Sequence, residues 1–223
     1  MIKLFYIEEG EGEPLILLHG NGESNEYFSK QIEVFDEYYR IFALDTRGHG
    51  KTPRGEKPFT LSQFADDLYD FMNMHKIEKA HILGFSDGGN IAMLFAIKHP
   101  ERVNKLVLNG ANFNPNGLKG FFKLLLDIRY KMVNKGKENE KSKRENELLS
   151  LMINEPYISE EELKSIKAPT LVIAGTRDLI KKKHTEKIAS LIPDSKLVFL
   201  NGNHAVARMN PEKFNSEVLD FLK

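Results

Sequence analysis

A G-x-S-x-G pattern, formed by Gly84, Ser86 and Gly88, lies between two apolar runs at 80–83 and 91–97. If the first run is a strand and the second a helix, Ser86 occupies a very tight strand-to-helix turn. Side chains two positions before and after the serine would collide in such a turn, so glycine fits both places. The pattern therefore predicts a strained serine whose hydroxyl projects from the edge of a sheet. The alternative is a glycine-rich turn with an incidental serine, because short patterns recur by chance.

Apolar runs alternate with helical patterns along most of the chain, as in α/β proteins. Continuous apolar runs are typical of strands that are buried on both faces of a parallel sheet. The sequence thus predicts a doubly wound, mostly parallel sheet with flanking helices. The main expected strands cover 15–18, 39–44, 80–85, 103–108, 170–174 and 196–200.

The alternation lapses between residues 113 and 167. Residues 118–133 have a helical pattern rich in Phe and Leu, and a tract of mixed charge follows at 134–146. We assign the charged tract no function, because it fits a solvated helix face or a mobile loop. We expect residues 1–112 and 168–223 to form one core, with 113–167 as a short helical lid inserted into it.

Composition narrows the possible partners and chemistry. The 223 residues carry 32 basic and 32 acidic side chains, and this balance gives no sign of nucleic-acid binding. The absence of cysteine excludes disulfides, thiolate catalysis and cysteine-type zinc sites. The histidine spacing suggests no metal site, and no run approaches membrane-spanning length. We therefore expect a cytoplasmic protein with no membrane partner, no metal and no cofactor.

Two loops after later strands carry the groups that would activate a serine. Asp178 follows the strand expected at 170–174, and His204 follows the one expected at 196–200. Parallel strands present their carboxyl ends at one sheet edge, where Ser86 is also expected. A serine needs a base and the base needs an orienting acid, so we predict Ser86, His204 and Asp178 as nucleophile, base and acid. Their order along the chain is that of nucleophile-elbow hydrolases.

These motifs together resemble those of α/β-hydrolase-fold enzymes over essentially the whole chain. The resemblance implies an oxyanion hole made by the backbone N–H groups of Asn21 and Asp87. The matching segments are His19-Gly20, Asp45-x-Arg47-Gly48-x-Gly50, Gly84-x-Ser86-x-Gly88, Gly175-x-x-Asp178 and His204.

The predicted function is that of a serine hydrolase acting on a small to medium carboxylic ester or related acyl substrate. Carbon–carbon bond hydrolysis, acyl transfer and perhydrolysis use the same three residues and stay open. A slow-turnover ligand-binding protein is the alternative outside catalysis. The lid would contribute an apolar substrate pocket, for which the candidates are Phe113, Leu118, Phe121, Phe122, Leu125 and Met152.

The Asp87 side chain has two interpretations. Its carboxylate could cap the start of the helix after the serine, where the helix dipole favours negative charge. It could instead present that charge to a cationic group on the substrate, such as an amine. We favour the cap.

Overall fold

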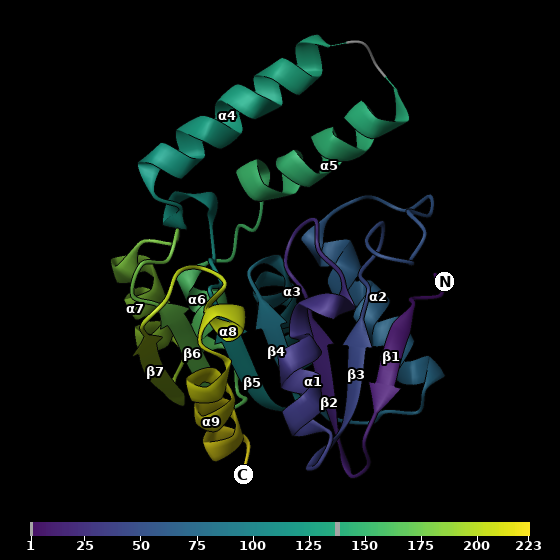
Figure 1. Cartoon of the computed structure of the whole chain (residues 1–223), viewed down its shortest axis with the longest axis vertical. Helices are drawn as coiled ribbons and strands as arrows, with labels where there is room; N and C mark the ends of the chain where they lie inside the picture. Colours follow the sequence, from purple (N-terminus) through teal and green to yellow (C-terminus); the bar gives the residue numbers. More distant parts are fainter. Residues whose placement is uncertain (1, 137–138) are drawn as a thin grey trace.

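The computed structural model describes residues 2–136 and 139–223, and within them one seven-stranded sheet has the order β1-β3-β2-β4-β5-β6-β7 (Figure 1). Strand β1 runs antiparallel to β3, and all other neighbouring strands are parallel. This confirms the predicted doubly wound, mostly parallel sheet. The strands are β1 (Tyr6–Glu9), β2 (Glu13–Leu18), β3 (Tyr39–Leu44), β4 (Ala80–Phe85), β5 (Val103–Asn109), β6 (Thr170–Gly175) and β7 (Ser195–Leu200).

Helices cover both faces of the sheet. The helices are α1 (Ser29–Phe35), α2 (Leu61–Met74), α3 (Asp87–Lys98), α4 (Gly120–Lys135), α5 (Glu140–Asn154), α6 (Glu160–Lys164), α7 (Lys182–Leu191), α8 (Val206–Met209) and α9 (Pro211–Leu222). Short 3₁₀ segments lie at Asn25–Phe28, Pro100–Arg102 and Pro115–Gly117. Helices α1 and α9 pack together on one face, while α2 and α3 pack together on the other.

The period of two along β2 divides the core between the two faces. Ile16 and Leu18 belong to the apolar cluster beneath α2 and α3, whereas Leu15 and Leu17 belong to the cluster beneath α1 and α9. All four side chains are essentially inaccessible to solvent. A continuous apolar run is therefore required, since alternate residues face opposite layers of helices. The same argument explains the uniformly buried strands β4 and β6.

Two helix ends differ from what the local sequence favours. The pattern of residues 26–35 favours one helix, but a 3₁₀ segment occupies Asn25–Phe28 and α1 begins only at Ser29. Asn210 precedes Pro211, the first residue of α9, and asparagine is a favoured cap at such a position. The Asn210 side chain makes no capping bond, however, and donates instead to the Asn201 carbonyl. The partner of this side chain is thus a carbonyl nine residues earlier, rather than an N–H group of α9.

Helices α4 and α5 form a hairpin that stands beyond the carboxyl ends of the parallel strands (Figure 1). Most of the charged tract of 134–146 continues α4 or begins α5, except that residues 137 and 138 lie outside the described part. In contrast, α6 packs on α3 and α7, and its Leu163 belongs to the main core. Within the described residues, no helix is both long enough and apolar enough to cross a membrane.

Candidate active site

Ser86 lies at the junction of β4 and α3, in the tight turn that its flanking glycines predict. Its φ of 53° and ψ of −119° place a non-glycine residue in a strained region of backbone space. A Cβ added at Gly84 would come within 2.2 Å of the Gly88 carbonyl oxygen, and one at Gly88 within 2.0 Å of the Leu18 carbonyl oxygen. The predicted clash across the turn is thereby confirmed for Gly84, whereas Gly88 must be glycine because the end of β2 lies against it.

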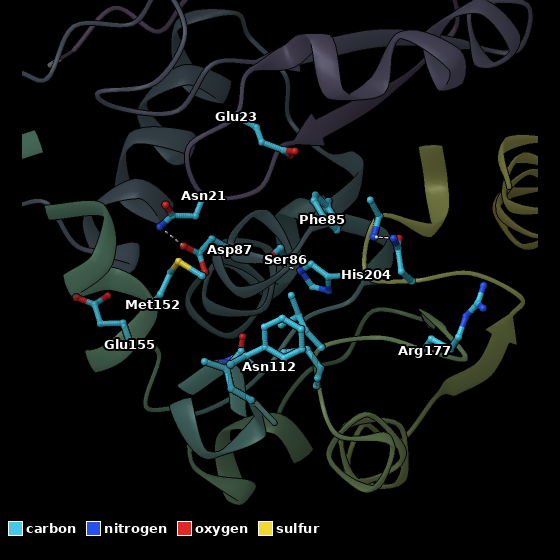
Figure 2. Close-up of a pocket in the computed structure, with 16 residues that line it drawn as sticks. Asn21, Glu23, Phe85, Ser86, Asp87, Asn112, Met152, Glu155, Arg177 and His204 are labelled. Carbon is cyan, nitrogen blue, oxygen red and sulfur yellow. Dashed lines mark hydrogen bonds between the residues drawn. The ribbon is translucent and has the colours of Figure 1, made fainter. Parts of the chain in front are cut away.

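A chain of hydrogen bonds connects Ser86, His204 and Asp178, and Figure 2 shows the first link, between Ser86 and His204. Ser86 Oγ lies 3.0 Å from His204 Nε2, and His204 Nδ1 lies 2.7 Å from Asp178 Oδ1. Because a carboxylate only accepts, Nδ1 carries the proton and Nε2 is free to accept the hydrogen of the serine hydroxyl. The three predicted residues therefore meet in the geometry needed to take a proton from Ser86.

Two backbone features hold this chain in place. Asp178 is buried, and its Oδ1 also accepts the N–H of Ile180 at 2.9 Å. Gly110 follows β5 with a φ of 62°, and a Cβ there would lie 2.9 Å from the ring of His204. The residue after β5 must therefore be glycine, because a side chain there would prevent the imidazole of His204 from reaching Asp178.

The loop after β2 brings Asn21 to the other side of the serine. His19 Nε2 accepts the N–H of Thr46 at 3.1 Å, so Nδ1 is the nitrogen that donates to the Gly20 carbonyl, 2.7 Å away. Burial lowers the pKa of His19, which keeps the imidazole neutral for these two bonds. His19 therefore supports the loop, and Asn21 lines the same cavity as Ser86 and Asp87.

The Asp87 carboxylate is held by two amides. Asn21 Nδ2 donates to Oδ2 at 2.8 Å, and Asn90 Nδ2 donates to Oδ1 at 3.2 Å. Asp87 lies in the first turn of α3, but its side-chain hydrogen bonds go to these asparagines rather than to backbone N–H groups of the helix. The expected cap is therefore wrong as a hydrogen-bond assignment. The side chain is 8% exposed, and burial raises its pKa.

A cavity of about 400 Å³ opens above Ser86, and its lining comes from the loops after the strands and from the α4–α5 hairpin. Of the predicted pocket residues, Leu118, Phe122 and Met152 line this cavity. Leu125 lines an adjoining apolar groove of about 260 Å³, which shares those three residues with the cavity. The other two line neither space: Phe113 is buried in the core, and Phe121 is 67% exposed.

The polar rim of the cavity includes residues that the sequence did not suggest. Glu23 comes from the loop after β2, Glu155 from the end of α5, and Arg177 from the loop before Asp178 (Figure 2). Burial raises the pKa of Glu23 and of Glu155, and the nearby Asp87 raises that of Glu155 further. Arg177 could have been anticipated, because it adjoins Asp178. Glu155 could not, since it is far from every motif in the sequence.

Polar contacts attach α5 to the core beside this cavity. Arg54 donates to Glu147 through Nε and Nη2, the latter at 2.6 Å. Asn21 Nδ2 also donates to the Leu148 carbonyl at 3.0 Å. Glu155 Oε2 accepts the N–H of Leu61, the first residue of α2, at 2.7 Å. The hairpin is therefore held over the cavity at several points.

The chain leading into α4 is anchored on His184. The ring of His184 stacks on Phe113, with centroids 4.2 Å apart, and its Nε2 accepts the N–H of Phe113 at 3.2 Å. Nearby, Lys181 N–H donates to the Gly117 carbonyl, and Lys119 N–H donates to that of Leu179. The bond to Nε2 requires a neutral imidazole. Burial, assisted by Lys181 and Lys187, lowers the pKa of His184 to about 4.

We expect His184 to make the protein less stable in acid. The folded-state pKa of about 4 lies below that of a free histidine, about 6.5, so the unfolded chain binds the proton first. The free energy of unfolding should therefore fall as the pH drops from about 6.5 to about 4. Urea titrations at several pH values should show a shallower dependence for His184→Gln, which keeps an acceptor but does not titrate. Equal slopes in both proteins would contradict this assignment.

In residues 2–136 and 139–223, no group of three or more His, Cys, Asp or Glu side chains is arranged to hold a metal ion. The cavity lining offers a serine hydroxyl, an imidazole, carboxylates, asparagine amides and the guanidinium of Arg177.

Relatives of known name extend over nearly the whole chain. A protein named Putative carbamate hydrolase RutD, from Agrobacterium fabrum, is 28% identical over an alignment that covers 96% of this chain and 94% of the relative. The 2-hydroxy-6-oxo-6-(2'-aminophenyl)hexa-2,4-dienoic acid hydrolase of Metapseudomonas resinovorans is also 28% identical, over 97% of this chain and 86% of the relative.

Structural similarity agrees with the sequence matches. The meta-cleavage product hydrolase of Pseudomonas fluorescens IP01 superposes with a TM-score of 0.81 at 25% identity, covering 99% of this chain and 94% of that one. Residues 13–150 match the family described as alpha/beta hydrolase fold. This match spans more than half of the chain and includes the turn at Ser86. The chain belongs to the α/β hydrolase fold family.

Proposed function

We propose that this protein is a serine hydrolase that cleaves a small to medium carboxylic ester or a related acyl substrate. The observation that carries the proposal is the chain from Ser86 Oγ to His204 Nε2, at 3.0 Å, and on to Asp178, at 2.7 Å. The arrangement stands at the floor of a cavity large enough for a small molecule. Hydrolase activity is also supported by the family and by the names of the relatives.

The reaction would proceed in two halves. His204 Nε2 takes the hydroxyl proton as Ser86 Oγ attacks the substrate carbonyl, and the negative charge that develops on the carbonyl oxygen faces the backbone N–H groups of Asn21 and Asp87. His204 then gives the proton to the leaving group, which departs and leaves an acyl-enzyme. In the second half His204 takes a proton from water, the resulting hydroxide attacks the acyl carbonyl, and Ser86 recovers its proton. Asp178 orients the imidazole and stabilises its positive charge.

We propose that the α4–α5 hairpin serves as the lid and binds the apolar part of the substrate. The groove beneath α4 is lined almost entirely by carbon atoms, and it continues from the cavity through Leu118, Phe122 and Met152. An acyl group attached to Ser86 could extend into this groove, where its burial would be favourable. The polar rim at Glu23 and Arg177 would face the leaving group and solvent.

Carbon–carbon bond hydrolysis is the second candidate. It is favoured by the names of two matches, the hexa-2,4-dienoic acid hydrolase and the meta-cleavage product hydrolase. The same nucleophile, base and acid would serve, so the geometry does not discriminate. A panel containing p-nitrophenyl esters of increasing acyl length together with a 2-hydroxy-6-oxo-dienoate would decide. Turnover of the dienoate well above that of every ester would displace the ester proposal.

The same panel separates catalysis from ligand binding alone. We expect the wild-type protein to release p-nitrophenol from at least one ester with multiple turnovers, and Ser86→Ala to lose this activity. A slow-turnover binding protein would instead bind panel members while producing no more than about one equivalent of product. That result, with correctly folded protein, would remove the hydrolase proposal.

We expect Asp87→Asn to change all esters alike and modestly, by less than about tenfold in kcat/KM. Both carboxylate oxygens already accept hydrogen bonds from Asn21 and Asn90, so little of the charge is available to a substrate. The measurement compares an ester carrying a free amine with its neutral isostere, in wild type and variant. A preference for the amino ester above about tenfold, lost in Asp87→Asn, would show that the carboxylate contacts the substrate.

A further inference from the structure

One face of α4 is apolar and unusually exposed. Along the helix, residues at spacings of three and four lie on one side. This side of α4 carries five large apolar residues, which are 46% to 67% exposed. They are Phe121, Leu124, Leu125, Ile128 and Met132, and we call them the outer stripe. No residue of α4 is fully buried, although α4 packs along α5.

The outer stripe is bordered by basic side chains. From Lys119 to Lys135 the chain contains five basic residues and a single acidic one, Asp127, whereas the whole protein has a net charge of zero. On a helical projection Lys131 and Lys135 fall beside Leu124 and Ile128 on the outer stripe. Both lysines are exposed. An exposed apolar stripe edged with lysine is typical of helices that lie in a lipid–water interface.

We propose that α4 binds the surface of an anionic lipid membrane through the outer stripe and its basic border. Charge complementarity selects this occupant. A second copy of the chain, docked through the same stripe about a two-fold axis, would bring two basic helices together and would be opposed by their repulsion. An anionic lipid surface attracts the lysines while its acyl region accepts the apolar side chains.

The position of α4 suits such a surface. The α4–α5 hairpin projects from the body of the protein, so a flat partner could reach the outer stripe without colliding with the sheet (Figure 1). Leu125 belongs to the outer stripe and also lines the apolar groove that continues to the cavity above Ser86. The sequence expectation of no membrane partner considered spanning segments, whereas this helix would lie in the plane of the surface.

The test is sedimentation with vesicles of phosphatidylcholine, with and without phosphatidylglycerol. We expect the wild-type chain to bind the phosphatidylglycerol vesicles and to dissociate as salt is added. Ile128→Gln/Met132→Gln, and separately Lys131→Glu/Lys135→Glu, should each weaken binding by about tenfold or more. The matched control is Tyr38→Gln/Met74→Gln, which removes two exposed apolar side chains outside the hairpin and should bind as wild type.

Each outcome decides the proposal. Ser86→Ala should bind as tightly as wild type, so a failure of the proposed catalysis leaves this test intact. The proposal is overturned if vesicles do not bind, if neutral vesicles bind equally well, or if the control variant is impaired to the same extent. Light scattering provides the alternative readout. A dimer in solution that Ile128→Gln/Met132→Gln converts to a monomer would assign the outer stripe to a second copy instead.

Discussion

A fluorophosphonate probe should label this protein once, at Ser86, and Ser86→Ala should abolish both the labelling and the hydrolysis of esters. The loss in kcat is expected to be roughly 10⁴- to 10⁶-fold, as found when other serine hydrolases lose their nucleophile. The reason is geometric. Among the hydroxyl groups of residues 2–136 and 139–223, that of Ser86 is the one that combines a strained backbone turn with a hydrogen bond to His204 Nε2.

Ser165→Ala is the matched control for the nucleophile. Ser165 is exposed at the end of α6, and its hydroxyl donates to the Glu162 carbonyl, which cannot take up the proton as an imidazole does. Labelling and turnover should stay at the wild-type level in this variant. Mass spectrometry that located the phosphonate on a residue other than Ser86, or on none while the protein is folded, would refute the assignment.

The second large effect is expected at Asp178. Asp178→Asn should lower kcat by roughly 10⁴-fold, the size of loss seen in serine proteases. Asp178 Oδ1 bonds both the Ile180 N–H and His204 Nδ1, so an asparagine oxygen in its place keeps both bonds and the conformation of the loop. The neutral amide no longer stabilises the positive charge that His204 acquires when it takes the serine proton. If the NH₂ group occupies this place instead, it favours the tautomer protonated at Nε2, which cannot accept the proton of Ser86.

Esterase rates and melting temperatures should be measured for Asp178→Asn beside Asp194→Asn. Asp194 is exposed just before β7, and its neutralisation should leave turnover unchanged. If Asp178→Asn were nearly as active as wild type, the imidazole would have to be oriented by another group. If it were inactive because it is unfolded, the melting temperature would reveal this directly.

Local sequence accounts for much of the fold and for the three residues of the proposed mechanism. The strand at Ala80–Phe85 was predicted at its observed bounds, since a short apolar run bounded by turn residues is typical of a buried strand. Within the turn at Ser86, the need for Gly84 is local, because a Cβ there would meet the Gly88 carbonyl, whereas Gly88 is required by the Leu18 carbonyl of β2. Asp178 and His204 could be anticipated because parallel strands place their following loops at one sheet edge.

The α4–α5 hairpin shows where local sequence stops being informative. Helix α4 carries apolar residues on more than one side, so the periodicity of the sequence does not indicate which of them face the cavity and which face solvent. Phe122 lines the cavity, while its neighbour Phe121 points to solvent. Only the docking of the hairpin, through contacts such as Arg54 with Glu147, sets this rotation.

The Asp87 side chain illustrates the same limit at the site itself. Its position in the first turn of α3 suggested a cap, but Asn21, 66 residues earlier, supplies a donor that a local pattern cannot reveal. Glu155 likewise enters the cavity rim through a bond to Leu61, 94 residues away. The sequence by itself determined the sheet, the serine turn and the order of the three reacting groups, because these depend on short-range sterics and strand topology. The tertiary structure alone decided the cavity lining, the partners of Asp87 and the outward face of α4, because these depend on contacts between segments far apart in the chain.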